Sequence, residues 1–165
     1  MLLKGKKLTS FVDYVVLKRE GGRLIFKVEP IKDWDAFDKI YPLPEPPKIV
    51  GKGGKKGTDL TDKRYQEALV SYETLRSHWI ILTSLTRVYF KYDDDTEENI
   101  EWEKVKMSDV NTWGEWHREL IDSGITLGEI ANIKSKIVDI NGLNQSKLNE
   151  ARDDFLAGLQ EPQSV

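Results

Sequence analysis

Residues 61–90 read TDKRYQEALVSYETLRSHWIILTSLTRVYF and carry the clearest helical periodicity in the chain. Large apolar residues recur there at spacings of three and four, which is the repeat of one helix face. Either Thr61 or Asp62 can cap the N-terminal end. The pattern predicts a long central helix over residues 63–87, about 35 Å long at 1.5 Å per residue. Its apolar stripe, in which Trp79 is expected to be mostly buried, consists of Tyr65, Leu69, Tyr72, Leu75, Trp79, Leu82 and Leu85.

The residues before this helix predict a β-hairpin. Residues 11–19 (FVDYVVLKR) and 23–28 (RLIFKV) are rich in β-branched and aromatic residues and flank Glu-Gly-Gly at 20–22. The continuous apolar run at 15–17 leaves the strand register open. A short helix is expected next, because three apolar residues follow Pro30 at spacings of three. They are Trp34, Phe37 and Ile40.

Residues 42–58, PLPEPPKIVGKGGKKGT, contain a glycine- and lysine-rich run that could suggest a phosphate-binding loop. A Walker loop needs a glycine, four further residues and then Gly-Lys-Ser/Thr. Counted from Gly51, the second glycine position holds Lys56, and counted from Gly53 it holds Thr58. The run also follows a proline cluster instead of a buried strand. We therefore predict a flexible strap over residues 42–60, because it has little apolar surface to offset the entropy of ordering.

The acidic run over residues 93–103 predicts a solvated turn, held to the body by Ile100, Trp102 and Val105. It does not match a calcium-binding EF-hand loop, because Glu98 occupies the sixth position, where such a loop needs glycine.

Three short helices are expected after this turn. The first ends at Gly124, a natural position for the residue after a helix. The second begins with a capping box formed by Thr126 and Glu129 and ends at Gly142. The third runs over residues 144–159. The apolar residues of the first and third helices that we take as candidate partner-binding anchors are Trp113, Trp116, Leu120, Phe155 and Leu159.

Together these segments predict an α+β chain that is mostly helical, with an N-terminal β-hairpin, one long central helix and a C-terminal cluster of short helices. Its 165 residues suit one compact domain with an appendage. The expected divisions are a hairpin with a short helix (1–41), the strap (42–60), a helical body (61–160) and a frayed tail (161–165).

Composition argues against an enzyme. The chain has no cysteine and two histidines, His78 and His117, neither of which lies in an H-E-x-x-H pattern. No serine lies in G-x-S-x-G. We expect no cofactor and no bound metal.

The net charge of −3 provides no general attraction for nucleic acid. No apolar run reaches the roughly 18 residues of a membrane span. The five tryptophans suit core and interface anchoring better than base stacking.

Several segments of the chain, taken in order, indicate a family resemblance. They are YPLPEPPK (41–48), DKRYQEALVSYETLRSHWIILTSL (62–85), IEWEKV (100–105), TWGEWHRELIDSGIT (112–126) and VDINGLNQSKLNEARDDFLAG (138–158). In this order and spacing, the chain resembles the tail assembly chaperones of long-tailed bacteriophages over residues 37–158.

The resemblance implies a non-enzymatic protein of the host cytoplasm that binds the tape measure protein, keeps its apolar helices soluble and helps to recruit tail tube protein. Self-association stays open, and no membrane partner is expected. Two alternatives stay open as well. One is a regulatory domain that binds nucleic acid through the basic strap, although nucleic acid is the less expected partner. The other is a structural connector protein of the virion.

Overall fold

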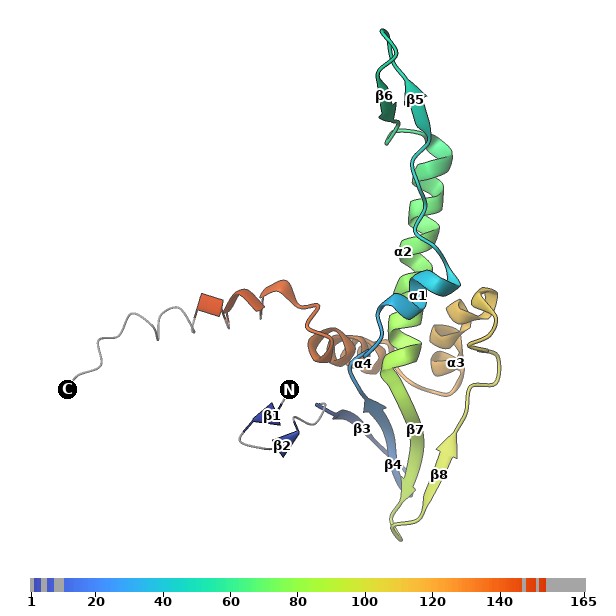
Figure 1. The fold of residues 1–165 in the computed structure, drawn as a ribbon. Coiled ribbons are helices and arrows are strands. Elements are labelled where there is room, and N and C mark those ends of the chain that lie inside the picture. The colour runs from blue at the N-terminus through green and yellow to red at the C-terminus, as the bar shows by residue number, and fades with distance from the viewer. Residues whose placement is uncertain (1, 4–5, 8–10, 147, 151, 154–165) are drawn as a thin grey trace, which may run out of the picture.

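The computed structural model describes residues 2–3, 6–7, 11–146, 148–150 and 152–153 (Figure 1). Its centre is a four-stranded antiparallel sheet in the order β3-β4-β7-β8. The strands are β3 (Asp13–Arg19), β4 (Gly22–Val28), β7 (Leu85–Tyr92) and β8 (Glu97–Ile100). The predicted N-terminal hairpin is confirmed as β3 and β4. Its turn contains Gly21 at φ 76°, a left-handed conformation that favours glycine.

The register that the sequence left open is now defined. Val15 and Leu17 lie opposite Phe26 and Leu24, and all four side chains are buried in the core. Because side chains alternate along a strand, Val16 points to the other side of the sheet and is 50% exposed.

The long connection between β4 and β7 rises away from the sheet (Figure 1). It contains α1 (Asp35–Ile40), a small hairpin of β5 (Lys48–Val50) with β6 (Lys56–Thr58), and α2 (Lys63–Ser84). Asp62 caps α2 by accepting a hydrogen bond from the Tyr65 amide. A further two-residue pair, β1 (Leu2–Leu3) with β2 (Lys6–Lys7), lies near the N-terminus.

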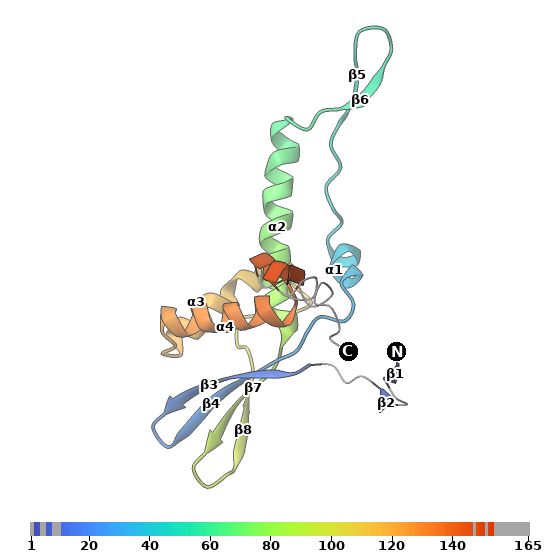
Figure 2. The same cartoon turned by 90° about the vertical axis from the view of Figure 1, so that its left-hand side faces the viewer.

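The segment predicted as a strap forms the β5–β6 hairpin at the far end of α2 (Figure 2). Every residue of both strands is exposed. The flexibility of residues 42–60 stays a prediction. A two-stranded ribbon of this kind has little stability of its own, which agrees with that prediction.

One face of the sheet is covered by α3 (Trp116–Asp122) and α4 (Leu127–Ile140) (Figure 2). The 3-10 helix η1 (Val110–Glu115), which precedes α3, packs against α2. Ion pairs join α4 to the two ends of β3, from Glu129 to Arg19 (2.8 Å) and from Lys136 to Asp13 (3.0 Å). Between these pairs, the buried isoleucines of α4 join the core cluster that contains Val15 and Leu17.

The predicted C-terminal end of the first of the three short helices and both predicted ends of the second are confirmed, whereas the predicted end of the third, at residue 159, lies outside the described residues. Thr126 and Glu129 form the capping box at the start of α4. Gly124 and Gly142 follow α3 and α4 with φ values of 82° and 65°. After α3, the Ile125 amide donates to the Leu120 carbonyl (3.0 Å), which completes a Schellman motif.

The prediction of a mostly helical chain is wrong. Half of the central sheet, β7 and β8, lies inside residues 61–160, which were predicted to be a helical body. The central helix, predicted to reach residue 87, ends at Ser84, and Leu85–Tyr92 is a strand. Leu85 continues the helical spacing of the preceding apolar residues, so local periodicity does not reveal the change. The hydrogen bonds that make this segment a strand come from β4, far away in the sequence.

The acidic run was also misread in part. Asp93–Thr96 is an exposed turn, as predicted, but Glu97–Ile100 pairs with β7 as an edge strand. Two of the expected anchors contact the core, because Val105 is buried and Trp102 packs against the core cluster. Ile100 is 45% exposed.

Trp79 is 3% exposed, which confirms its predicted burial. Its ring lies 5.5 Å from that of Phe37 and 6.2 Å from that of Trp34, measured between centroids. The short helix α1 therefore packs against the lower half of α2 through aromatic contacts.

We expect Trp79→Ala to lower the free energy of unfolding by about 3 to 5 kcal/mol, as large aromatic truncations in cores do. Urea denaturation followed by circular dichroism measures the change. Val70→Ala is the control, because Val70 lies on the same helix and is 67% exposed. Equal denaturation midpoints for the two variants would show that Trp79 adds little to the core.

The ion pair between Arg19 and Glu129 should make the stability of the fold depend on pH. The Arg19 guanidinium, followed by the Thr126 amide, lowers the pKa of Glu129 from 4.5 to about 2. A carboxylate with a depressed pKa stabilises the fold above its ordinary pKa, and this contribution disappears as the pH falls from about 4.5 through about 2. Glu129→Gln should therefore reduce stability at neutral pH, and the difference from the wild type should shrink toward pH 2. Denaturation midpoints across this range measure it, with Glu73→Gln at an exposed position of α2 as the control.

Candidate partner-binding site

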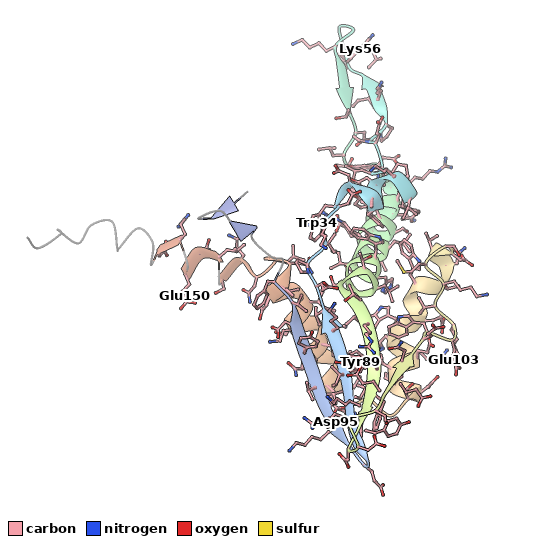
Figure 3. The ribbon with its side chains drawn as sticks, turned by 60° about the horizontal axis from the view of Figure 1, so that its bottom comes forward. Trp34, Lys56, Tyr89, Asp95, Glu103 and Glu150 are labelled. Carbon is pink, nitrogen blue, oxygen red and sulfur yellow. The ribbon has the colours of Figure 1, made fainter. Side chains whose placement is uncertain are left out.

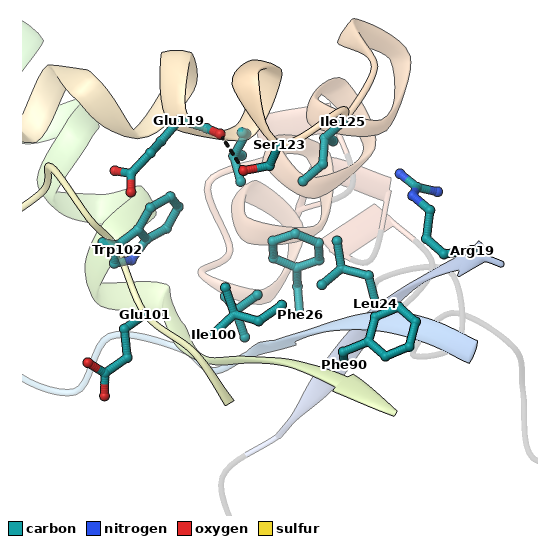
Figure 4. Close-up of a pocket in the computed structure, with 12 residues that line it drawn as sticks. Arg19, Leu24, Phe26, Phe90, Ile100, Glu101, Trp102, Glu119, Ser123 and Ile125 are labelled. Atoms are coloured by element: carbon teal, nitrogen blue, oxygen red, sulfur yellow. Dashed lines mark hydrogen bonds between the residues drawn. The ribbon is translucent and has the colours of Figure 1, made fainter. Parts of the chain in front are cut away.

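An apolar cavity of about 280 Å³ lies between the covered face of the sheet and α3 (Figure 4). Both sides of the cavity are lined by large apolar side chains. The sheet contributes Leu24, Phe26, Val88, Phe90 and Ile100, and the opposite wall contains Trp102, Leu120 and Ile125.

The cavity reaches the surface at the edge of the sheet. β8 is the last strand of the sheet order, and all four of its residues are exposed. Ile100 at its end is 45% exposed although it lines the cavity. The cavity therefore borders the protein surface beside β8.

The rim of this opening is acidic. A second depression next to the cavity is lined by Ile100, Ser123, four acidic residues and one lysine. The lysine is Lys104, which pairs with Asp122 at 3.3 Å. The acidic residues are Glu101, Glu103, Glu119 and Asp122. Carboxylates thus outnumber ammonium groups at the rim, which favours a partner that carries positive charge beside its apolar residue.

Glu119 belongs to both the cavity and the depression and is 9% exposed. Its Oε1 accepts hydrogen bonds from the backbone amides of Glu103 and Lys104. This carboxylate therefore holds the segment after β8 against α3. Its other oxygen, Oε2, is buried and has no hydrogen-bond partner in the part of the chain that the structure describes.

The structure places the sequence-predicted anchors mostly in the core. Trp113, Trp116 and Leu120 are 0%, 2% and 5% exposed and belong to one buried cluster. Among these three, only Leu120 lines the cavity. Phe155 and Leu159 lie outside the described residues.

Trp116 has a structural partner that the sequence did not reveal. Its Nε1–H donates to Nδ1 of His78 on α2 (3.0 Å). Burial, followed by the nearby charge of Lys134, lowers the pKa of His78, so the imidazole is neutral at pH 7 and can accept this bond. The pair ties α3 to α2, and it gives His78 a structural role.

Sequence reasoning missed the strands β7 and β8 because it ended the helix at residue 87 without a strand after it and interpreted residues 93–103 as a turn. The alternation of Val88 and Phe90 with Tyr89 and Lys91 was the available signal for a strand. Val88 and Phe90 line the cavity, whereas Tyr89 and Lys91 point away from it.

In the described part of the chain, no group of three or more His, Asp or Glu side chains could hold a metal ion. None of the helices described by the structure has both the length and the apolar character that crossing a bilayer requires. Comparison of the chain with models of known families, with curated proteins and with solved structures finds no match.

We expect Glu119→Ala to lower the free energy of unfolding by about 1 to 3 kcal/mol, because two backbone amides lose their acceptor. Glu119→Gln retains one acceptor oxygen and should cost less. Urea denaturation of the two variants measures the difference, with Glu101→Ala at an exposed position of the rim as the control. If the alanine and glutamine variants were equally stable, the hydrogen bonds from the Glu103 and Lys104 amides would contribute nothing to the free energy of unfolding.

Proposed function

We propose that this protein is a non-enzymatic tail assembly chaperone of a long-tailed bacteriophage. In this proposal it works in the cytoplasm of the bacterial host, binds helices of the tape measure protein and assists assembly of the tail tube. The resemblance over residues 37–158 suggests the family. The observation that carries the binding role is the apolar cavity that opens beside β8.

The size of the cavity suits an anchoring contact. Pockets that hold a whole small molecule commonly range over roughly 300 to 1,000 Å³. A cavity of about 280 Å³ lies just below this range, so we expect it to hold one or two side chains. The rest of a bound helix would lie outside it. An amphipathic helix typically binds by inserting a few apolar side chains into such a groove. The acidic rim then favours helices with lysine or arginine next to the inserted residue.

The role of the two tryptophans changes in this proposal. Trp113 and Trp116 would contact a partner only if η1 and α3 left the core, because both are buried. In the structure described above, the two tryptophans lie in the buried cluster that also contains Leu120 of the cavity wall. Phe90, Ile100 and Trp102 are the residues that a partner would reach first.

A second candidate surface is the projecting arm, which consists of residues 43–71. Several large apolar side chains are exposed there. They are Leu43, Ile49, Val50, Leu60 and Val70. We place the anchoring contact at β8, where the apolar cavity lies, and test the two surfaces against each other.

The test is to co-express the chain with overlapping fragments of a tape measure protein and to measure which fragments become soluble and co-purify. Ile100→Asp introduces a charge at the cavity mouth and should reduce co-purification by about tenfold or more, because a buried unpaired charge is costly. Ile49→Asp is the matched control, because Ile49 and Ile100 are 46% and 45% exposed. If only Ile49→Asp abolished binding, the arm would be the binding surface. If the wild-type chain bound no fragment, the chaperone proposal would fail.

The exposed lysines of the β5–β6 hairpin keep the nucleic-acid alternative open. They are Lys48, Lys52, Lys55 and Lys56. Binding to phosphates through them would weaken steeply with added salt, whereas apolar recognition of a helix would not. The virion connector alternative would be supported instead if purified particles contained the protein in stoichiometric amounts.

A further inference from the structure

The side of the β3-β4-β7-β8 sheet that faces away from α4, here called the outer face, is covered by no described helix (Figure 2). Figure 3, in which this side comes forward, shows Tyr89 on β7. The strand register arranges the side chains of the outer face in rows that run across the strands. These rows differ in chemistry, and their order indicates what the face can bind.

The first row is mainly cationic. Lys18 lies directly opposite Arg23, Arg23 lies opposite Lys91, and Lys91 lies opposite Glu97 on the edge strand β8. Like charges in directly opposite positions destabilise a sheet. Lys91 pairs with Asp95 (3.3 Å), but Lys18 and Arg23 have no carboxylate within ion-pair distance in the described part of the chain. Two adjacent cations on an exposed face are therefore left without compensation.

The second row is apolar. It consists of Val16, Ile25 and Tyr89, which lie opposite one another on β3, β4 and β7. Val16 is 50% exposed. Ile25 and Tyr89 are 8% and 9% exposed, because neighbouring long side chains cover them. The Arg87 guanidinium, for example, lies 4.0 Å from the centroid of the Tyr89 ring.

The third row consists of Tyr14, Lys27 and Arg87. Its cations already have carboxylate partners, since Lys27 pairs with Glu29 (3.2 Å) and Arg87 pairs with Glu97 (3.0 Å). Tyr14 is 47% exposed and offers a hydroxyl group at the free side of β3. The outer face is thus polar on this side, and its uncompensated positive charge lies at Lys18 and Arg23, at the β3–β4 end of the first row.

We infer that the outer face binds an amphipathic helix of a partner protein, with the apolar stripe of that helix on the second row and its carboxylates against Lys18 and Arg23. The first and third rows are four residues apart along each strand, which corresponds to about 13 Å. A helix with its side chains is about 10 to 12 Å wide, so it fits between the two rows. The second row crosses three strands, about 10 Å, which is close to two helical turns.

The same observations disfavour single-stranded nucleic acid as the occupant. Such ligands need exposed aromatic rings on which bases can stack. The Tyr89 ring is nearly buried and lies against Arg87, and the middle of the face is formed by valine and isoleucine side chains. This binding site is separate from the cavity beside β8, which lies on the opposite face of the sheet, and it does not depend on the chaperone proposal.

The test uses a fluorescently labelled 18-residue synthetic helix with leucines at spacings of three and four and glutamates along one flank. Fluorescence anisotropy measures its binding to the full-length protein, next to the same peptide with glutamine or with lysine in place of glutamate. The glutamate peptide should bind about tenfold more tightly than the glutamine peptide, and the lysine peptide should bind least, because complementary charges favour association.

Variants then locate the site. Lys18→Glu combined with Arg23→Glu should weaken binding of the glutamate peptide by roughly tenfold, and Val16→Asp should weaken it as well. All three residues are exposed, so the variants should fold, which circular dichroism checks. Lys52→Glu combined with Lys55→Glu makes the same charge change on the β5–β6 hairpin and should leave binding unchanged.

Four results would overturn the inference. The first is no measurable binding of the glutamate peptide, and the second is equal weakening by the two double variants. The third is tighter binding of a single-stranded oligonucleotide that the outer-face variants abolish. The fourth is a wild-type dimer that Lys18→Glu with Arg23→Glu converts to a monomer in sedimentation experiments, since the occupant would then be a second copy of this chain.

Discussion

At Ser84 the chain leaves α2 and enters β7 with no loop between them. Ser84 is fully buried, and its carbonyl accepts a hydrogen bond from the Glu29 amide (2.9 Å). Its hydroxyl accepts from Nδ2 of Asn141 (2.9 Å), while Oδ1 of Asn141 accepts from the Ile31 amide (2.8 Å). Four segments therefore meet here: the end of α2, the start of β7, the exit from β4 and the end of α4. Because buried polar groups are costly when unpaired, this network constrains all four together.

The direction of β7 after this junction determines the chemistry of both faces of the sheet. Val88 and Phe90 point toward α3 and form a wall of the cavity, whereas Arg87, Tyr89 and Lys91 point to the outer face. A shift of one residue at the junction would exchange these two sets. The apolar cavity with its acidic rim and the basic outer face are thus two consequences of one register.

The two surfaces differ in charge. The rim of the cavity has an excess of carboxylates, and the outer face has two uncompensated cations. Both surfaces lie on strands of the central sheet, while the aromatic contacts of Trp79 with α1 and the bond from Trp116 to His78 join the helices to one another. Such an arrangement suits a protein that binds other chains, because it combines apolar anchoring points with charges that select the partner.

The sequence by itself determined the features that depend on neighbouring residues: the β3–β4 hairpin, a cap of α2 at residue 61 or 62, the capping box of α4, the glycine ends of α3 and α4, and the burial of Trp79. Each rests on contacts within a few residues or on an unbroken helical repeat. The tertiary structure alone decided that residues 85–92 form a strand, because their hydrogen-bond partners on β4 lie more than fifty residues away in the sequence. It also decided that Trp113 and Trp116 are core residues, since a helical stripe does not show what will cover it. The cavity could not be predicted for the same reason, because its walls come from strands and helices that meet only in the folded chain.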